Sequence, residues 1–219
     1  MHEAFTQPSE SLADQAYTIV ERMIISLELP PGSVFSEGQL SDEIGIGRTP
    51  LREALQKLAH GRLVAALPRR GMMVMEINVV EHLAMLDTRR VLDRLIAERA
   101  AKRRSGAHAK RLEECASRMN QTALEGDTRA FMELDQECDK ILAEAARNVF
   151  AVQSAASMHS HCRRFWSVHK HSGDLQESAA LHTALMLVVA EGDAAKAANA
   201  SDALIDYLER FTKEALELL

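Results

Sequence analysis

Residues 36–71 read SEGQLSDEIGIGRTPLREALQKLAHGRLVAALPRRG, and this stretch decides the fold of the N-terminal part of the chain. Its first signal is Ser36, which is followed three residues later by Gln39, the spacing of a capping box. A helix is therefore predicted over 37–44. The glycine that comes next, Gly45, breaks this helix and starts a tight turn.

A second helix is predicted to begin at Thr49 and Pro50. Thr49 can cap it, and Pro50 fits its first position, where the missing N–H costs nothing. One face of this helix is apolar and the other polar: Leu51, Ala54, Leu55 and Leu58 form the first, and Thr49, Arg52 and Gln56 the second, with Arg48 just before the helix. Such polar side chains at the leading end of a helix suit the major groove of DNA, because they reach base edges and phosphates.

A small β-hairpin is predicted after the second helix. Its strands are expected over 63–66 and 72–75, and the connection LPRRG carries Arg69, Arg70 and Gly71. The basic tip can enter a minor groove or contact phosphates.

Charge in this part of the chain has the opposite sign to that of the whole chain. Residues 48–71 carry six basic side chains and one acidic one, a net charge of +5, whereas the whole chain has a net charge of −6. Phosphate attraction is screened over about 8 Å at physiological salt, so a local reversal of sign points to a focused anionic partner. The alternative is a solvated helix followed by a basic turn.

The motif GRTPLREAL at 47–55, followed by Leu63-Val64 and by PRRG at 68–71, resembles the signature of the GntR family of winged helix-turn-helix transcription regulators. This resemblance implies that Arg48, Thr49, Arg52 and the wing glycine Gly71 contact operator DNA. Two positions depart from the family pattern. Gly47 stands where the family usually has serine, and Gly38 stands where some members place an arginine that touches DNA.

Composition favours a helical protein. The 219 residues are 47% hydrophobic but only 4% aromatic, with five prolines. The longest apolar runs, such as 184–190, are too short to span a membrane. The N-terminus lacks a signal-peptide pattern, so we expect a cytoplasmic protein. Cys115, Cys138 and Cys162 form no CxxC pair and are expected to be reduced structural thiols.

The chain is predicted to be mainly α, with a flexible tail over 1–11 and two domains. Residues 12–76 form a winged helix-turn-helix DNA-binding domain of three helices and a small β-hairpin, whose first helix covers 12–29. Residues 77–219 form an all-α antiparallel bundle of about six helices. Their predicted ranges are 79–104, 107–124, 128–146, 149–169 with a break at 172–173, 175–191, and 193 to the C-terminus. Inward positions of the first of these helices are Leu83, Leu86, Leu92, Leu95 and Ile96.

The bundle resembles the FCD ligand-binding domain found in the FadR-like branch of the GntR family. The matching stretches are RRVLD at 89–93, residues 135–142, Asn148, residues 180–182 and Gly192-Asp193. The resemblance implies effector binding and dimerisation by this domain.

Many such domains bind a divalent metal through an aspartate, a histidine one turn later and two further histidines on the last two helices. This sequence keeps Asp135 and His182 but has Asp139 and Leu204 at the other two positions. The residual set of Asp135, Asp139 and His182 is oxygen-rich and incomplete, which favours at most a weakly held divalent ion. We therefore expect no tightly bound metal cofactor. The alternative for His182 is an ordinary buried, hydrogen-bonded histidine.

Arginines inside the bundle indicate an acidic ligand, since an inward guanidinium binds a carboxylate through two hydrogen bonds. The predicted effector pocket consists of Arg89, Asp135, Asp139, Arg163 and His182. The alternative is that one of Arg163 and Arg164 faces water and the other pairs with an acid of the bundle. The pairs His159/His161 and His169/His171 are expected to be solvated, because residues two apart do not share a helix face.

These features predict a sequence-specific transcription regulator, a repressor, that binds palindromic double-stranded operator DNA as a homodimer and responds to a small-molecule effector, an organic acid. It is predicted not to be an enzyme and to have no membrane partner. Two alternatives remain at this point. The first is a metal-dependent enzyme that uses Asp135, Asp139 and His182, and the second is an architectural DNA binder whose bundle only dimerises.

Overall fold

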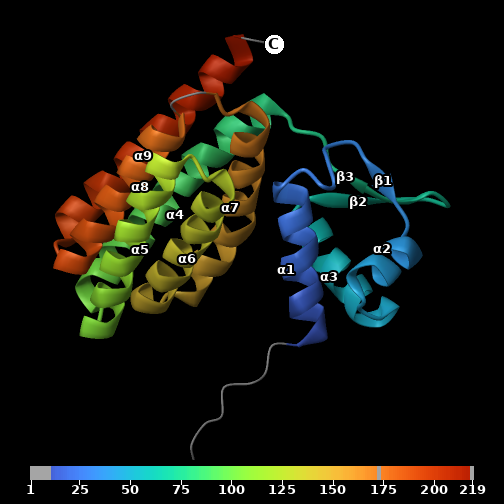
Figure 1. Ribbon diagram of the computed structural model, residues 1–219, viewed down its shortest axis with the longest axis horizontal. Coiled ribbons are helices and arrows are strands. Elements are labelled where there is room, and N and C mark those ends of the chain that lie inside the picture. The colour runs from blue at the N-terminus through green and yellow to red at the C-terminus, as the bar shows by residue number, and fades with distance from the viewer. Residues whose placement is uncertain (1–10, 172–173, 218–219) are drawn as a thin grey trace, which may run out of the picture. The chain divides into compact units, whose positions relative to one another are not determined.

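The computed structural model describes residues 11–171 and 174–217 and forms two compact units, the first ending at Ile77 and the second beginning at Asn78 (Figure 1). The predicted tail lies outside the described residues except for Ser11. The predicted break at 172–173 also lies outside them.

Helix α1 spans Leu12–Ile25 and begins where the Ser11 hydroxyl accepts a hydrogen bond from the backbone N–H of Asp14 (3.1 Å). The prediction that this helix reaches residue 29 is wrong. Leu27 adopts a φ of 65°, a left-handed conformation that cannot continue a right-handed helix. The apolar pattern continues beyond the helix because Leu29 still packs against the core of this unit.

Helices α2 (Glu37–Ile44) and α3 (Arg48–His60) form the helix-turn-helix. The bounds of α2 are as predicted, and Ser36 caps it by accepting from the backbone N–H of Gln39 (3.1 Å). In the turn, the Ser41 hydroxyl donates to the carbonyl of Ile46 (2.6 Å). The prediction that Thr49 caps α3 is wrong, because the helix starts at Arg48 and the residue before it, a glycine, offers no side-chain cap.

The wing is a three-stranded antiparallel sheet in the order β1-β3-β2. Strands β2 (Val64–Leu67) and β3 (Gly71–Val74) form the predicted hairpin, with bounds shifted by one residue. Strand β1 (Val34–Phe35) pairs with β3 and was not predicted. Two residues are too few to show the alternation by which a strand is recognised.

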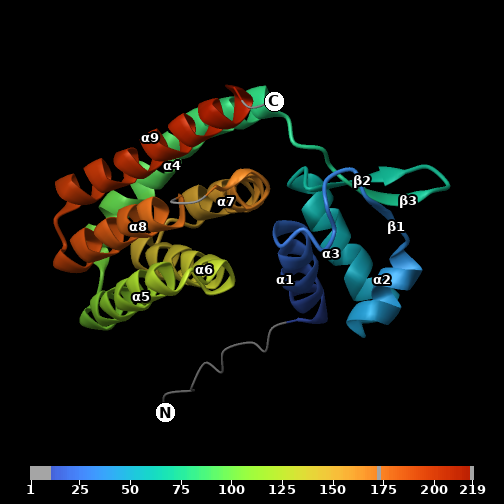
Figure 2. The same cartoon turned by 45° about the horizontal axis from the view of Figure 1, so that its top comes forward.

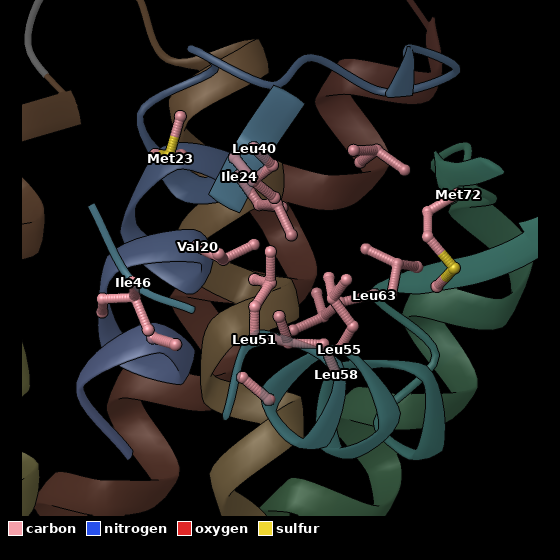
Figure 3. Close-up of a cluster of buried hydrophobic side chains, with 14 residues drawn as sticks. Val20, Met23, Ile24, Leu40, Ile46, Leu51, Leu55, Leu58, Leu63 and Met72 are labelled. Atoms are coloured by element: carbon pink, nitrogen blue, oxygen red, sulfur yellow. The ribbon is translucent and has the colours of Figure 1, made fainter. Parts of the chain in front are cut away.

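One apolar cluster joins the elements of the first unit (Figure 3). Leu51, Leu55 and Leu58 of α3 pack against Val20 and Ile24 of α1, and all five side chains are at most 2% exposed. Because this cluster buries only one face of α3, the opposite face stays in solvent.

The second unit is a bundle of helices: α4 (Val79–Arg103), α5 (Gly106–Glu125), α6 (Thr128–Ala146), α7 (Val149–His169), α8 (Asp174–Glu191) and α9 (Ala194–Glu217). Helix α4 lies along α9, and α5 lies along α8 (Figure 2). None of the described helices is long and apolar enough to cross a membrane. The three cysteines are buried and form no disulfide.

One inward position of α4 was predicted incorrectly. Leu95 is 36% exposed, whereas two polar side chains of the same helix, His82 and Arg89, are buried. The buried face of α4 therefore includes polar positions, which a search for an apolar stripe assigns to solvent.

Gly71 lies where β3 passes β1. Its φ is +100°, and a Cβ on this residue would lie 2.4 Å from the carbonyl oxygen of Phe35. We expect Gly71→Ala to lower the melting temperature of the protein and to disorder the wing, because both the backbone conformation and the contact with β1 become unfavourable.

Gly45→Ala is the matched control for this prediction. Gly45 also has a left-handed φ of +68°, but nothing lies within 4 Å of the added Cβ. Its loss of stability, measured by thermal denaturation followed by circular dichroism, should be smaller and near 1 kcal/mol, roughly the conformational cost alone. Equal losses for the two variants would show that the contact with Phe35 does not constrain the wing.

Candidate functional site

The outward face of α3 carries Thr49, Arg52 and Gln56, and all three are exposed. Arg52 donates from Nε and Nη2 to one carboxylate oxygen of Glu37, at 3.1 and 2.8 Å, and its side chain remains 61% exposed. Exposed ion pairs contribute little free energy. Glu37 thus fixes the orientation of the Arg52 guanidinium through Nε and Nη2. The Nη1 atom makes neither of these two hydrogen bonds.

Arg48 is exposed at the first residue of α3 and lies beside Gly38 of α2. A Cβ on Gly38 would approach the Nη2 atom of Arg48 to 3.3 Å. The departure from the family pattern at this position therefore has a structural consequence. The glycine leaves room for the Arg48 guanidinium next to α2.

The tip of the wing presents Arg69 and Arg70 to solvent. The backbone N–H of Arg70 donates to the carbonyl of Leu67 (3.0 Å), and Arg69 adopts a left-handed φ of 62°. This tight turn projects both arginines beyond the strands. Gly71, which follows them, is half-buried.

One exposed basic residue of this segment pairs with an acid of another helix. Lys57 forms an ion pair with Asp14 of α1 at 2.7 Å, and its side chain stays 54% exposed. The contact joins α3 to α1.

In the bundle, all five residues predicted for the effector pocket line one small cavity of about 30 Å³. They come from α4 (Arg89), α6 (Asp135 and Asp139), α7 (Arg163) and α8 (His182). A cavity of this size accommodates one or two water molecules rather than a metabolite. The polar side chains close the space by pairing with one another.

Arg163 bridges the two aspartates of α6. Its Nε donates to Asp135 Oδ2 at 2.6 Å, and its Nη2 donates to Asp139 Oδ2. His182 contacts the other oxygen of Asp135 through Nε2 at 3.0 Å, and its Nδ1 lies 2.8 Å from the carbonyl oxygen of Ser178. All of these side chains are largely buried.

Two members of this network were missed. His159 contacts Asp93 through Nε2 and Asp139 through Nδ1, both at 2.8 Å, and Asp93 also pairs with Arg89 at 2.8 Å. The prediction that His159 is solvated is wrong, since its side chain is only 14% exposed. The available signal was spacing, because His159 lies four residues before Arg163, and Asp93 lies four residues after Arg89.

The remaining alternatives for this region are also settled by burial. Arg163 and Arg164 are both buried, so the alternative in which one of them faces water is wrong, although Arg163 does pair with acids of the bundle. His161 and His169 are half-buried, and the ring of His169 packs against Phe165 at 4.4 Å. Only His171 of the two histidine pairs is exposed as expected.

We refer to Arg89, Asp93, Asp135, Asp139, His159, Arg163 and His182 as the charge cluster. Burial alone would raise the pKa of Asp93, but Arg89 and His159 outweigh it and hold that pKa well below its usual range. Burial is likewise outweighed at Asp135 by Arg163 and His182, and at Asp139 by His159 and Arg163, so both pKa values are lowered.

The histidines of the charge cluster shift in the opposite sense. Burial would lower the pKa of His159, but Asp139 and Asp93 raise it to about 9. Burial would also lower the pKa of His182, which Asp135 raises. The protonated form of each histidine and the ionised form of its aspartate partners thus stabilise each other inside the bundle.

Comparison with known proteins assigns both units to families. Residues 84–207 match the family described as FCD domain, and residues 12–74 match the family described as bacterial regulatory proteins, gntR family.

Individual relatives are transcriptional regulators. The HTH-type transcriptional repressor RspR of Escherichia coli strain K12 is 27% identical over 139 residues, which cover 64% of this chain and 61% of RspR. The match thus spans less than two thirds of the length of that relative. An HTH-type regulator of Streptomyces ambofaciens, described as uncharacterized and lying in an unstable DNA locus, is 39% identical over 62 residues, 28% of this chain and 26% of its own.

Among solved structures, E. coli McbR/YncC has the same fold. It superposes with a TM-score of 0.81 over 93% of this chain and 98% of its own, at 14% sequence identity. At this identity the likeness concerns the fold alone.

Asp93→Asn tests whether the charge cluster stabilises the bundle. The substitution leaves Arg89 and His159 buried without their shared carboxylate, and removing one partner of a buried ion pair costs about 3–5 kcal/mol. Asp87→Asn is the control, because Asp87 lies on the same helix and is exposed. We expect a much lower denaturation midpoint for Asp93→Asn than for Asp87→Asn, and similar midpoints would contradict a stabilising role.

Proposed function

Because the chain belongs to the GntR family of bacterial transcriptional regulators and carries an FCD domain, we propose that it represses transcription by binding a palindromic operator as a homodimer, under the control of a small carboxylate-bearing metabolite. The proposed domains are 12–76 for DNA binding and 77–219 for effector binding and dimerisation. The observation that carries the proposal is the set of exposed basic side chains on α3 and the wing tip, in a chain whose net charge is −6.

Helix α3 would enter the major groove. One face of the helix packs in the core, so the exposed face would contact the groove. The exposed residues are Arg48, Thr49, Arg52 and Gln56. Arginine pairs well with guanine and glutamine with adenine, because each matches two hydrogen-bonding positions of the base edge. The contact with Glu37 holds Arg52 in place before DNA arrives, which lowers the entropy lost on binding.

The wing would add contacts that position the unit. Arg69 and Arg70 protrude at its tip, where they can reach phosphates or a minor groove. Gly71 keeps the strands close enough for the tip to hold this shape.

A single unit of this size buries too little DNA surface for operator-level specificity. Two copies that read half-sites about one helical turn apart meet that need, and they imply a palindromic operator. We therefore assign dimerisation to the chain as part of its function.

The effector site would be the charge cluster. An incoming carboxylate can replace Asp135 or Asp139 on the guanidinium of Arg163, or Asp93 on that of Arg89, because it offers the same two-oxygen geometry. Since the cavity of about 30 Å³ is too small for a metabolite, such a ligand must open it. A coupling free energy of about 1–3 kcal/mol between this opening and the DNA-binding unit is sufficient for regulation.

The metal-dependent enzyme is less well supported. Asp135 and Asp139, which would have to hold the metal, are paired with Arg163. Cys162 lines the same cavity, but burial raises the pKa of its thiol, which disfavours the nucleophilic thiolate. The relatives with assigned roles are transcriptional regulators, which are not enzymes.

Arg52→Ala tests DNA reading by α3. The probe is a duplex enriched from a random pool by the wild-type protein. We expect affinity in a gel-shift titration to fall about 10- to 100-fold, because a base or phosphate contact is lost.

Arg118→Ala is the matched control for Arg52→Ala. Arg118 of α5 is also paired with a single glutamate, Glu137, at 2.9 Å, and its side chain is 62% exposed. It should leave affinity unchanged. Equal affinities for wild type and Arg52→Ala would remove Arg52 from the DNA-binding surface.

A thermal-shift screen of small mono- and dicarboxylic acids tests the effector site. We expect at least one acid to raise the melting temperature and to change operator affinity. Arg163→Lys should weaken this acid about 10-fold or more, because lysine keeps the charge but loses the planar fork. A screen in which no acid binds would contradict control by an organic acid and would favour a purely architectural DNA binder.

A further inference from the structure

The bundle keeps only part of the metal-binding pattern that its family resemblance implies. Asp135 and His182 are present, but Asp139 and Leu204 replace two histidines, and Leu204 is buried with only 6% exposure. An alkyl side chain cannot ligate a metal. The donors left for an ion are two carboxylates and one imidazole, with His159 as a fourth candidate next to Asp139.

The carboxylates of this set already face a cation. The Arg163 guanidinium lies between Asp135 and Asp139 and donates to one oxygen of each. A guanidinium binds two carboxylates from fixed directions, as a metal ion with two oxygen ligands would. An ion between the same two aspartates would have to displace Arg163.

The histidines are also unsuited to ligation as they stand. His182 directs Nε2 to a carboxylate oxygen of Asp135 and Nδ1 to the carbonyl oxygen of Ser178. His159 directs Nε2 to Asp93 and Nδ1 to Asp139, both carboxylates. Both ring nitrogens of each histidine therefore already contact oxygen atoms, so neither ring directs a free nitrogen at an ion between Asp135 and Asp139.

The charge balance gives the same result. Each of the three aspartates already contacts an arginine guanidinium, from Arg89 or Arg163, so the carboxylates have positive partners without an ion. A divalent cation would add two further positive charges to a buried site. Within the described residues, no three acidic, histidine or cysteine side chains are arranged to hold a metal. The residues present therefore do not fit the metal that the family resemblance implies.

We propose that Arg163 takes the place of the metal ion in this domain, so that the wild-type bundle binds no divalent metal at this site and a metal site appears when Arg163 is removed. Since the four side chains are not arranged to hold a metal in the wild-type structure, they would have to turn into the space that the guanidinium leaves. Asp135, Asp139, His159 and His182 would then supply two oxygens and two nitrogens, a donor set that zinc accepts in tetrahedral sites. The inference concerns the bundle alone and does not depend on operator binding or on the identity of the effector.

The experiment compares the full chain with Arg163→Met after treatment with EDTA and desalting. Melting temperatures are recorded with EDTA, Zn²⁺, Ni²⁺ or Mn²⁺, and the metal content is measured by elemental mass spectrometry. The wild type should hold far less than one ion per chain and show the same melting temperature in all conditions. Arg163→Met should gain about 5 °C or more with Zn²⁺ and retain about one ion per chain.

The double variant Arg163→Met/Asp135→Asn separates this site from zinc bound by histidines elsewhere on the chain. It lacks the arginine and one donor, so the gain in melting temperature with Zn²⁺ should disappear. Should Arg163→Met not fold in EDTA, the recovery of near-ultraviolet circular dichroism on addition of Zn²⁺ serves as the readout. The single variant should recover, and the double variant should not.

Three results would overturn the inference. The first is a wild-type protein that retains about one metal ion per chain and melts at a lower temperature in EDTA. The second is an Arg163→Met variant that neither melts at a higher temperature nor recovers its fold with any of the three metals. The third is a gain with Zn²⁺ that persists in the double variant, because the ion would then lie elsewhere.

Discussion

Three aspartates inside the bundle can remain ionised only because a positive charge lies within hydrogen-bonding distance of each. An isolated carboxylate in a protein interior is too costly to persist. Arg163 satisfies Asp135 and Asp139 from α7, while Arg89 and His159 satisfy Asp93. Apolar contacts tolerate small shifts between helices, whereas ion pairs near 2.6–3.0 Å do not. The pairing therefore sets how α4, α6, α7 and α8 align along one another.

In the N-terminal unit the charged side chains are exposed rather than buried. Its interior is an apolar cluster between α1 and α3, and its arginines stay in solvent, where an ion pair such as that of Arg52 with Glu37 can exchange partners at little cost. The same residue types thus serve two purposes. Buried arginines hold helices in place, and exposed arginines remain available to an anionic surface.

Much of this structure follows from local signals in the sequence. The cap at Ser36, the breaks at the glycines and the apolar spacing of α3 act within a few residues, so helix positions could be predicted. Strand β1 and the end of α1 could not be predicted, because β1 depends on pairing with β3, and Leu29 continues the apolar pattern beyond α1 by packing against the core. Asp135, Asp139 and His182 could be brought together by resemblance, and Arg89 and Arg163 as inward-facing arginines. His159 could not be added, because its partners Asp93 and Asp139 lie on other helices, which spacing within α7 does not indicate.

A network in which every charge is already paired suits a switch better than an open cavity does. If an effector carboxylate displaces an aspartate from Arg163 or Arg89, the total number of ion pairs changes little, so the two arrangements can lie close in free energy. Helix α4, which carries Arg89 and Asp93, begins at the cap of Asn78, whose side chain accepts from the backbone N–H groups of Val80 and Glu81. Met75 is held by its backbone N–H to the carbonyl of Leu63 in the DNA-binding unit. Only two residues of chain separate these anchored positions. If the ion pairs of the charge cluster exchange partners and α4 shifts, this short linker can transmit the movement to the wing.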